Sequence, residues 1–237
     1  MTRVALLRYP GTWSERDFEH AFSLVPGVET EILWHEDADL RGFDAAVVPG
    51  GFTYGDYLRA GAIAKISPAT KALRRFAEDG KPVLGSCNGF QILCEAGLLP
   101  GALLRNAGLE YRCDWIHIRV EQDATPWTAG LRGRVLRMPI GHGEGCFVAD
   151  ADTIAALEER RQVVFRYTDA RGAATAESNP NGSAGNIAGV MNEWGNVVGL
   201  MPHPERCVEA LLGGTDGYQV LANLTLALAG TPSAIYR

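Results

Sequence analysis

The sequence predicts an α/β protein with a mostly parallel β-sheet and helices on both faces of the sheet. Short apolar runs alternate with helical patterns along the first half of the chain, which is typical of parallel sheets with crossover helices. The run at residues 44–48 does not alternate between polar and apolar side chains, which indicates a strand buried on both faces. In such sheets, functional groups lie at the carboxyl ends of the strands.

The first half of the chain contains four predicted strands, at residues 4–7, 28–34, 44–48 and 83–86. A helix follows the first strand, with Ser14 as its expected N-cap, and ends near Leu24 before a Pro-Gly pair. A second predicted helix spans residues 68–79, and Gly80 is its expected C-cap. A third helix is expected to begin directly after Cys87.

The second half of the chain differs from the first in its sequence pattern. Residues 115–121 and part of 135–140 alternate between polar and apolar side chains. This pattern predicts a small antiparallel extension. Further strands are expected at residues 162–168, 187–191 and 197–201, with a hairpin turn at Gly195 and Asn196. Helices are expected at residues 150–161, capped by Asp150 or Asp152, and at residues 218–228.

Composition narrows the class of protein. The chain has 237 residues and a net charge of −6, which argues against nucleic acid or an anionic membrane as the main partner. No apolar stretch is long enough to span a membrane, and the first residues do not resemble a signal peptide. The five scattered cysteines lack metal-ligand spacing and favour free thiols in a reducing cytoplasm. No linker or repeat divides the chain, so we expect one domain over residues 1–237.

The segment G-S-C-N-G at residues 85–89 follows a predicted strand and has the spacing of a nucleophile elbow, with Cys87 in place of serine. The two glycines allow a strained turn to hold the central side chain at the start of a helix. The helix N-terminus favours the thiolate over the thiol. Taken alone, the segment fits a buried cysteine beside a glycine-rich turn equally well.

A cysteine nucleophile usually needs a base and a group that orients the base. His203 and Glu205 follow another predicted strand, and Pro204 fixes the backbone between them. Alone, they could form an ordinary surface turn. The backbone N–H groups of Asn88 and Gly51 are the candidate donors for an oxyanion, unless the two glycines at residues 50–51 form only a turn.

The motifs around Cys87, Gly51 and His203 together resemble those of a known family. The segments P-G-G at residues 49–51, G-S-C-N-G-F-Q at 85–91 and H-P-E at 203–205 resemble the class I (triad) glutamine amidotransferases. Longer blocks narrow the resemblance to the glutaminase subunit of phosphoribosylformylglycinamidine (FGAM) synthase over nearly the whole chain: G-G-F-T-Y-G-D-Y-L-R-A-G at residues 50–61, I-G-H-G-E-G at 140–145, N-P-N-G-S at 179–183 and M-P-H-P-E-R at 201–206. One departure is Gly141, where a small residue such as alanine is expected before H-G-E-G. The resemblance implies a flavodoxin-like fold.

The resemblance also implies a mechanism. Cys87 attacks the side-chain amide of glutamine, His203 transfers protons, and Glu205 orients His203. The products are glutamate and ammonia, which passes to a large synthetase subunit that uses ATP to convert formylglycinamide ribonucleotide (FGAR) to FGAM in de novo purine (IMP) biosynthesis. This chain has no Walker A motif, so we expect no cofactor on it, and ATP and Mg²⁺ on the partner. A small accessory subunit is a further expected partner.

Three residues are candidates to bind glutamine: Gln91, Gly50 and His142. A core or capping role for Gln91 fits as well. His142 and Glu144 could also bind a metal, but no third ligand lies at a suitable spacing, so no metal is expected. The polar loop at residues 54–59 is expected to act in docking or gating, with an ordinary solvated loop as the alternative.

The alternative enzyme class is a DJ-1/PfpI-like cysteine hydrolase or deglycase, which shares the elbow. The late H-P-E segment and the Gly-Gly loop argue against it. A binding subunit with an inactive site is also disfavoured, because Cys87, His203 and Glu205 are all present.

Overall fold

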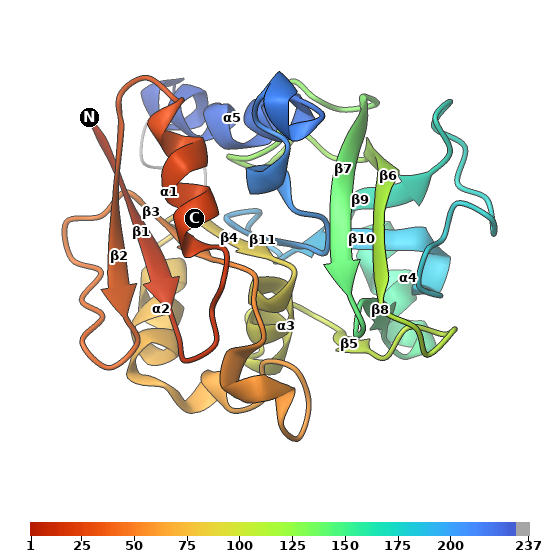
Figure 1. Cartoon of the computed structure of the whole chain (residues 1–237), viewed down its shortest axis with the longest axis horizontal. Helices are drawn as coiled ribbons and strands as arrows, with labels where there is room; N and C mark the ends of the chain where they lie inside the picture. Colours follow the sequence, from red (N-terminus) through yellow and green to blue (C-terminus); the bar gives the residue numbers. More distant parts are fainter. Residues whose placement is uncertain (231–237) are drawn as a thin grey trace.

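The computed structural model describes residues 1–230, which form a nine-stranded mixed sheet and a two-stranded ribbon (Figure 1). Five neighbouring strands are parallel: β2 (Val28–Trp34), β1 (Thr2–Arg8), β3 (Ala45–Val48), β4 (Val83–Ser86) and β11 (Val197–Leu200). Four strands continue the sheet through antiparallel pairings: β10 (Ile187–Met191), β9 (Val163–Thr168), β6 (Arg112–Val120) and β7 (Val135–His142). The ribbon pairs β5 (Ala102–Leu104) with β8 (Cys146–Val148).

The predicted fold class is confirmed. Because β10 and β6 reverse direction, β9 and β7 run the same way as the five parallel strands, so most strands share one direction. The predicted antiparallel extension is present and joins the parallel part through the hairpin turn at Gly195, which has a φ of 74°. The arrows of β1, β2 and β7 all point toward the bottom of Figure 1, where the functional loops are expected.

Helices cover both faces of the sheet. Helices α1 (Glu15–Ser23) and α5 (Asp216–Gly230) contribute to one hydrophobic core, and α2 (Pro68–Glu78), α3 (Asn88–Glu95) and α4 (Ala151–Glu159) contribute to the other. Successive residues of β1 alternate between the two cores, with Leu6 in the first and Leu7 in the second. Burial on both sides is the reason why the central strands show no polar alternation in sequence.

Two local predictions have different outcomes. Asp150 caps α4 as predicted, accepting a hydrogen bond from the Thr153 N–H at 2.7 Å. Ser14 does not cap α1 with its side chain. Its hydroxyl oxygen instead accepts a hydrogen bond from the backbone N–H of Gly50 at 2.8 Å, and so attaches the start of α1 to the end of β3.

The described residues end at Gly230, so the last part of the predicted domain, residues 231–237, lies outside them. Within residues 1–230, none of the helices combines the length and the apolar character needed to cross a bilayer.

Helix α3 lies against the sheet at an unusually short distance. A Cβ atom on Gly89 would be 1.8 Å from the carbonyl oxygen of Val48 in β3. A Cβ on Gly199 of β11 would be 2.1 Å from the Phe90 ring, and one on Gly85 would be 2.8 Å from the Gly89 backbone. Glycine is therefore required at these positions for the first turn of α3 to rest on three strands.

Gly89→Ala tests this packing. The added methyl group must displace the Val48 carbonyl, so we expect the free energy of unfolding to fall by about 1–3 kcal/mol, as in overpacked cores. Urea titration followed by circular dichroism measures the loss. Gly108→Ala is the matched control, because a Cβ there meets only the flexible end of Arg112 at 3.5 Å. Equal stability of the two variants would contradict the proposed packing constraint.

Candidate active site

Cys87 lies between the end of β4 and the start of α3, with φ 51° and ψ −107°. Positive φ is rare for a side-chain-bearing residue and indicates strain that the surrounding structure must hold. The Cys87 N–H donates to the carbonyl of Leu200 in β11 at 2.8 Å, and the side chain is 5% exposed. The structure therefore has the geometry that the sequence predicts for a nucleophile elbow.

His203 and Glu205 form a buried pair next to the cysteine. The Nδ1 atom of His203 is 2.6 Å from Oε1 of Glu205, and the residues are 3% and 1% exposed. His203 lines the same cavity as Cys87. Within the described residues, Nε2 of His203 makes no hydrogen bond, so this nitrogen is available for proton transfer in the cavity.

The protonation states of His203 and Glu205 depend on each other. Burial by itself lowers the pKa of His203, but the Glu205 carboxylate and the interaction with Cys87 outweigh burial and raise the pKa to about 10. Burial alone would raise the pKa of Glu205, and the His203 cation reverses this and holds that pKa below its usual value. Both shifts favour an imidazolium beside a carboxylate, the form in which His203 carries a proton that it can donate.

Gly51, one of the two predicted oxyanion donors, lines the cavity that contains Cys87 and His203. Thr12 and Gly51 form a bridge in which the flanking residues exchange the hydrogen bonds, Trp13 N–H to Gly50 O and Phe52 N–H to Gly11 O. In such a pair the central N–H groups point away from each other. A Cβ on Gly51 would be 2.5 Å from Gly11 O, so the close approach needs glycine.

Asn88, the other predicted oxyanion donor, is the first residue of α3, so its N–H has no partner within the helix. The Asn88 side chain, in contrast, is used structurally. It accepts from the Thr53 N–H at 3.2 Å and donates to Gln91 Oε1 at 2.8 Å.

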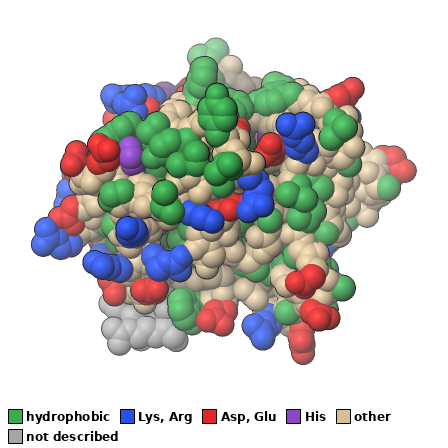
Figure 2. Space-filling view, turned by 90° about the horizontal axis from the view of Figure 1, so that it is seen from below, with side chains coloured by type: hydrophobic (Ala, Val, Ile, Leu, Met, Phe, Trp, Pro, Cys, Tyr) green, Lys and Arg blue, Asp and Glu red, His purple; other side chains and the backbone are tan. Residues whose placement is uncertain are grey.

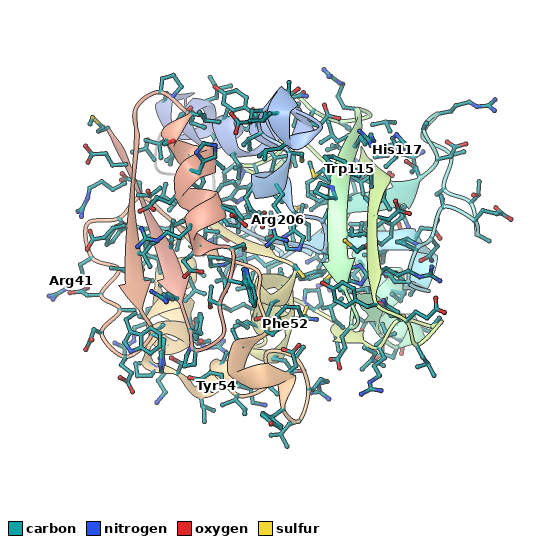
Figure 3. All side chains as sticks on the ribbon, viewed as in Figure 1. Arg41, Phe52, Tyr54, Trp115, His117 and Arg206 are labelled. Atoms are coloured by element: carbon teal, nitrogen blue, oxygen red, sulfur yellow. The ribbon has the colours of Figure 1, made fainter. Side chains whose placement is uncertain are left out.

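Two cavities meet at Cys87. The first has a volume of about 230 Å³ and is lined by Asp56, Gln91, Arg105, His142 and Glu144, with further contributions from Gly51, Phe52, Leu109, Glu110, Tyr111, Gly141 and Gly143. The second, of about 280 Å³, is lined by Trp13, Gly51, Phe52, Tyr111, Gly141, His203 and Arg206. Figure 3 shows the labelled Phe52 and Arg206 coming from distant segments toward the middle of the molecule.

The three candidate glutamine-binding residues lie in different surroundings. Gln91 lines the first cavity, but its amide donates to the Glu144 carbonyl at 2.5 Å. His142 also lines it, with Nδ1 bonded to Asn106 Oδ1 at 3.0 Å. Gly50 lines neither cavity. It lies against the His203 ring, where a Cβ would be 2.8 Å from Cε1, so its position favours a packing role.

Two residues near the site, Ser86 and Asn106, have contacts that the sequence does not predict. Ser86 donates a hydrogen bond from its hydroxyl to Glu205 Oε2 at 3.2 Å. Asn106 orders the loop at residues 141–145: its amide donates to His142 O at 2.9 Å, and its Oδ1 accepts from Gly145 N at 3.0 Å. Ser86 could have been suspected, because it adjoins the nucleophile. Asn106 could not, because the partners that it orders in this loop lie 36 or more residues away.

Comparison with known proteins identifies the family. Residues 1–228 match the family described as the CobB/CobQ-like glutamine amidotransferase domain. The chain belongs to this family. Among similar proteins are those from Thermomicrobium roseum and Moorella thermoacetica, 56% and 52% identical over 223 residues, or 94% of each chain. Both are named phosphoribosylformylglycinamidine synthase subunit PurQ.

Solved structures agree with this assignment. The structure described as PurLQS from Thermotoga maritima contains a chain that is 41% identical, with a TM-score of 0.85, covering 96% of this chain and 99% of that chain. A glutamine amidotransferase from the same organism, 18% identical with a TM-score of 0.60, shares the fold. Glutamine amidotransferase activity is therefore favoured over the alternative of a DJ-1/PfpI-like hydrolase or deglycase.

Within this amidotransferase, Ser86→Ala tests whether the hydroxyl positions the Glu205–His203 pair. Loss of the hydroxyl leaves a buried carboxylate oxygen with one donor fewer, which typically costs about 1–3 kcal/mol. We expect kcat for glutamine hydrolysis to fall about tenfold, with a smaller change in KM. Steady-state kinetics of glutamate release measures both constants.

The control is Ser23→Ala, whose hydroxyl bonds only to His20 O on the surface of α1. Its kinetics should match those of the unmodified protein. If the Ser86 and Ser23 variants have the same kcat, the hydroxyl of Ser86 does not position the pair.

Proposed function

We propose that this chain is the glutaminase subunit of phosphoribosylformylglycinamidine synthase, which hydrolyses glutamine and delivers ammonia for the conversion of FGAR to FGAM in purine biosynthesis. The observation that carries the proposal is the strained Cys87 elbow facing the buried His203–Glu205 pair. The names of relatives that are 52% and 56% identical over nearly their full length support the substrate and pathway.

The geometry supports the following steps. Sγ of Cys87 attacks the side-chain carbonyl carbon of glutamine, and the N–H groups of Gly51 and Asn88 bind the oxyanion that forms. His203 donates its proton to the departing nitrogen, so ammonia leaves and a thioester remains. A water molecule then attacks the thioester, with His203 accepting its proton. Glutamate leaves, and the Cys87 sulfur is released.

The rim of the two cavities supports docking of a partner. Figure 2 views the molecule from the bottom of Figure 1, the side toward which β1 and β2 run, and shows hydrophobic side chains gathered there among charged ones. We call the following exposed residues the apolar rim: Trp13, Phe52, Tyr57, Leu58, Leu109 and Tyr111. Aromatic residues exposed around a cavity are typical of interfaces. We assign the rim to the large synthetase subunit that receives the ammonia.

The residues of the loop at 54–59 differ in how far they are exposed on this surface. Tyr57 and Leu58 project outward, with 75% and 92% exposure. The Tyr54 ring packs edge-on against His35, with the ring centroids 6.0 Å apart. Arg59 forms two hydrogen bonds to Glu95 and is held against α3. The outward residues are therefore the ones assigned to docking.

The remaining parts of the reaction belong to the partners. We propose that ATP and Mg²⁺ bind the synthetase subunit, that this chain needs no cofactor for its own step, and that a small accessory subunit completes the complex. A cytoplasmic location fits the five free cysteines of the described chain.

Cys87→Ser separates the release of ammonia from glutamine on this chain from the use of ammonia on the synthetase subunit. Because the hydroxyl is a far weaker nucleophile than the thiolate, we expect glutamine-dependent FGAM synthesis by the assembled complex to fall by at least about a thousandfold. Synthesis from added ammonium salt should stay within about twofold, since the synthetase subunit is intact. FGAM formation with each nitrogen source measures both. Loss of both activities in a complex that still assembles would contradict this division.

Leu58→Asp tests the docking surface. A carboxylate in the middle of an apolar contact must lose water without a partner, so we expect the affinity for the synthetase subunit to fall by about tenfold or more. Calorimetry or sedimentation measures the affinity. Leu211→Asp is the matched control, since Leu211 is 93% exposed and precedes Gly213 by two residues. A Cβ on Gly213 would be 3.0 Å from the Trp115 ring, and Figure 3 shows Trp115 well apart from Phe52 of the rim. Equal affinities of the two variants would exclude the rim as the docking surface.

A further inference from the structure

Strand β6 extends beyond the end of its neighbour β9, so the first half of β6 is paired on one side only. It pairs with β7 from Arg112 onward, but with β9 only from His117 onward, opposite Thr168. Beyond Thr168 the chain leaves the sheet in a turn at Asp169. Residues 112–116, about 17 Å of strand, therefore form an open edge.

The open edge presents backbone groups that another strand could bind. The Glu121 N–H donates to Val164 O, so the odd-numbered residues of β6 direct their N–H and C=O groups toward the β9 side. The same alternation points the backbone groups of Cys113 and Trp115 into the space beyond the end of β9. Cys113 is exposed there. The edge thus has the pattern of donors and acceptors that extends a sheet by one strand.

A groove of about 490 Å³ separates this edge from the segment at residues 175–180. The segment includes the start of the N-P-N-G-S block at 179–183, to which the proposed reaction assigns no role. Within the described part of the chain, no hydrogen bond joins residues 175–180 to residues 112–116. The segment is held from its other side, where the Asn186 amide donates to Thr175 O at 2.7 Å. Its own contacts therefore leave the β6 edge unoccupied.

The groove carries an excess of negative charge. Asp114, Asp169 and Glu177 line it. Among the described residues that line the groove, Arg112 is the one Lys or Arg, and its guanidinium lies 3.5 Å from the Glu110 carboxylate. Complementary charge across an interface favours a segment that carries Lys or Arg.

Thr168 supplies an independent indication of a ligand. It lines the groove at the end of β9 and is 3% exposed. Its buried Oγ1 has no hydrogen-bond partner among residues 1–230. Buried hydroxyl groups are usually satisfied, so an unpartnered one beside an open strand edge indicates a polar group that arrives from outside.

Asp114 protects the edge in the free chain. Its Oδ1 accepts a hydrogen bond from the Trp115 N–H at 2.7 Å, which occupies one of the outward donors. Charged side chains on an open edge hinder pairing with unrelated chains. A Lys or Arg on an arriving strand would pair with this carboxylate and release the Trp115 N–H for the new strand. The same side chain therefore excludes neutral segments and admits basic ones.

We propose that the open edge of β6 binds an extended, basic segment of the synthetase subunit as an added strand. The groove begins at Arg112, the residue after Tyr111 of the apolar rim, so one partner can cover both surfaces. In this mode of recognition, backbone hydrogen bonds supply affinity, and contacts to alternate side chains supply selectivity. The inference rests on the proposed function, which assigns the rim to that subunit.

Hydrogen–deuterium exchange of the unmodified chain tests strand addition directly. In the assembled complex, the amides of Cys113 and Trp115 should exchange about tenfold or more slowly than in the free chain, because a new strand accepts their hydrogen bonds. Mass spectrometry of a peptide that covers residues 109–117 measures the change. The outer edge of β2, at the far end of the sheet, is the reference and should not change. Unaltered exchange in residues 109–117 would overturn the proposal.

Cys113→Pro tests the same contact by mutation. Proline removes an outward N–H and leaves the pairing with β7 intact, because Cys113 does not use its N–H in that pairing. The affinity for the synthetase subunit, measured by calorimetry, should fall about tenfold or more. Cys113→Ala is the matched control, since it removes the thiol and keeps the N–H, and its affinity should stay within about twofold. Equal affinities of two folded variants would contradict strand addition.

Asp114→Asn combined with Glu177→Gln tests the charge of the segment. Asparagine keeps an acceptor for the Trp115 N–H but removes the carboxylate. The affinity should fall about fivefold at low salt, and the loss should shrink at high salt because ions screen the attraction. Glu159→Gln, on the exposed side of α4 and outside the groove, is the control. If the double variant and the control bind equally well, the segment is not basic and the proposal is wrong.

The remaining outcomes are distinguishable. If the chain alone dimerises in sedimentation and residues 109–117 are protected in that dimer, the edge binds a second copy and the proposal is wrong. If the edge stays unprotected in a complex that forms FGAM from glutamine, the proposal fails and the proposed function stands. If the assembled complex forms FGAM from ammonium salt but never from glutamine, the proposed function itself fails.

Discussion

The close approach of α3 to the sheet determines where every reacting group lies. Gly89 rests on the Val48 carbonyl, and Gly199 leaves room for the Phe90 ring, so the first turn of α3 is fixed relative to β3, β4 and β11. This contact holds Cys87 at a positive φ that an unsupported chain would leave. It also brings the Cys87 N–H to Leu200, three residues before His203. This packing therefore helps to position both Cys87 and His203, the proposed nucleophile and base.

The antiparallel half of the sheet completes the site rather than merely enlarging the core. β7 supplies the Pro139 carbonyl that accepts from the His203 N–H at 2.9 Å, and the Gly141 carbonyl lies 3.8 Å from Cys87 Sγ. The loop after β7 carries His142 and Glu144 into the first cavity. The parallel strands β4 and β11 thus lead into Cys87 and His203, and β7 both fixes the His203 backbone and carries one wall of the first cavity.

The sequence predicts those parts of the site that depend on local backbone chemistry. The elbow at Cys87 and the H-P-E segment are recognisable because glycine and proline restrict the chain over a few residues. The functions of Ser14, Gly50 and Asn106 are not recognisable, because each depends on a contact across the fold: Ser14 with Gly50, Gly50 with the His203 ring, and Asn106 with the loop after β7. The ribbon of β5 and β8 is missed for another reason, since three-residue strands are too short to show a period.

The chemistry of ammonia explains why backbone strain, apolar side chains and charged side chains occur together around one cysteine. Ammonia leaves as a neutral base and would be protonated in water, which would end its use as a nucleophile. In the proposed reaction, glutamine occupies the first cavity before this step, and the apolar rim faces the solvent that must be excluded after it. A chain that acted alone would gain nothing from exposing Tyr57 and Leu58 beside its active site, because exposed apolar area favours aggregation. The rim is therefore understandable as the part of the site that a second protein completes.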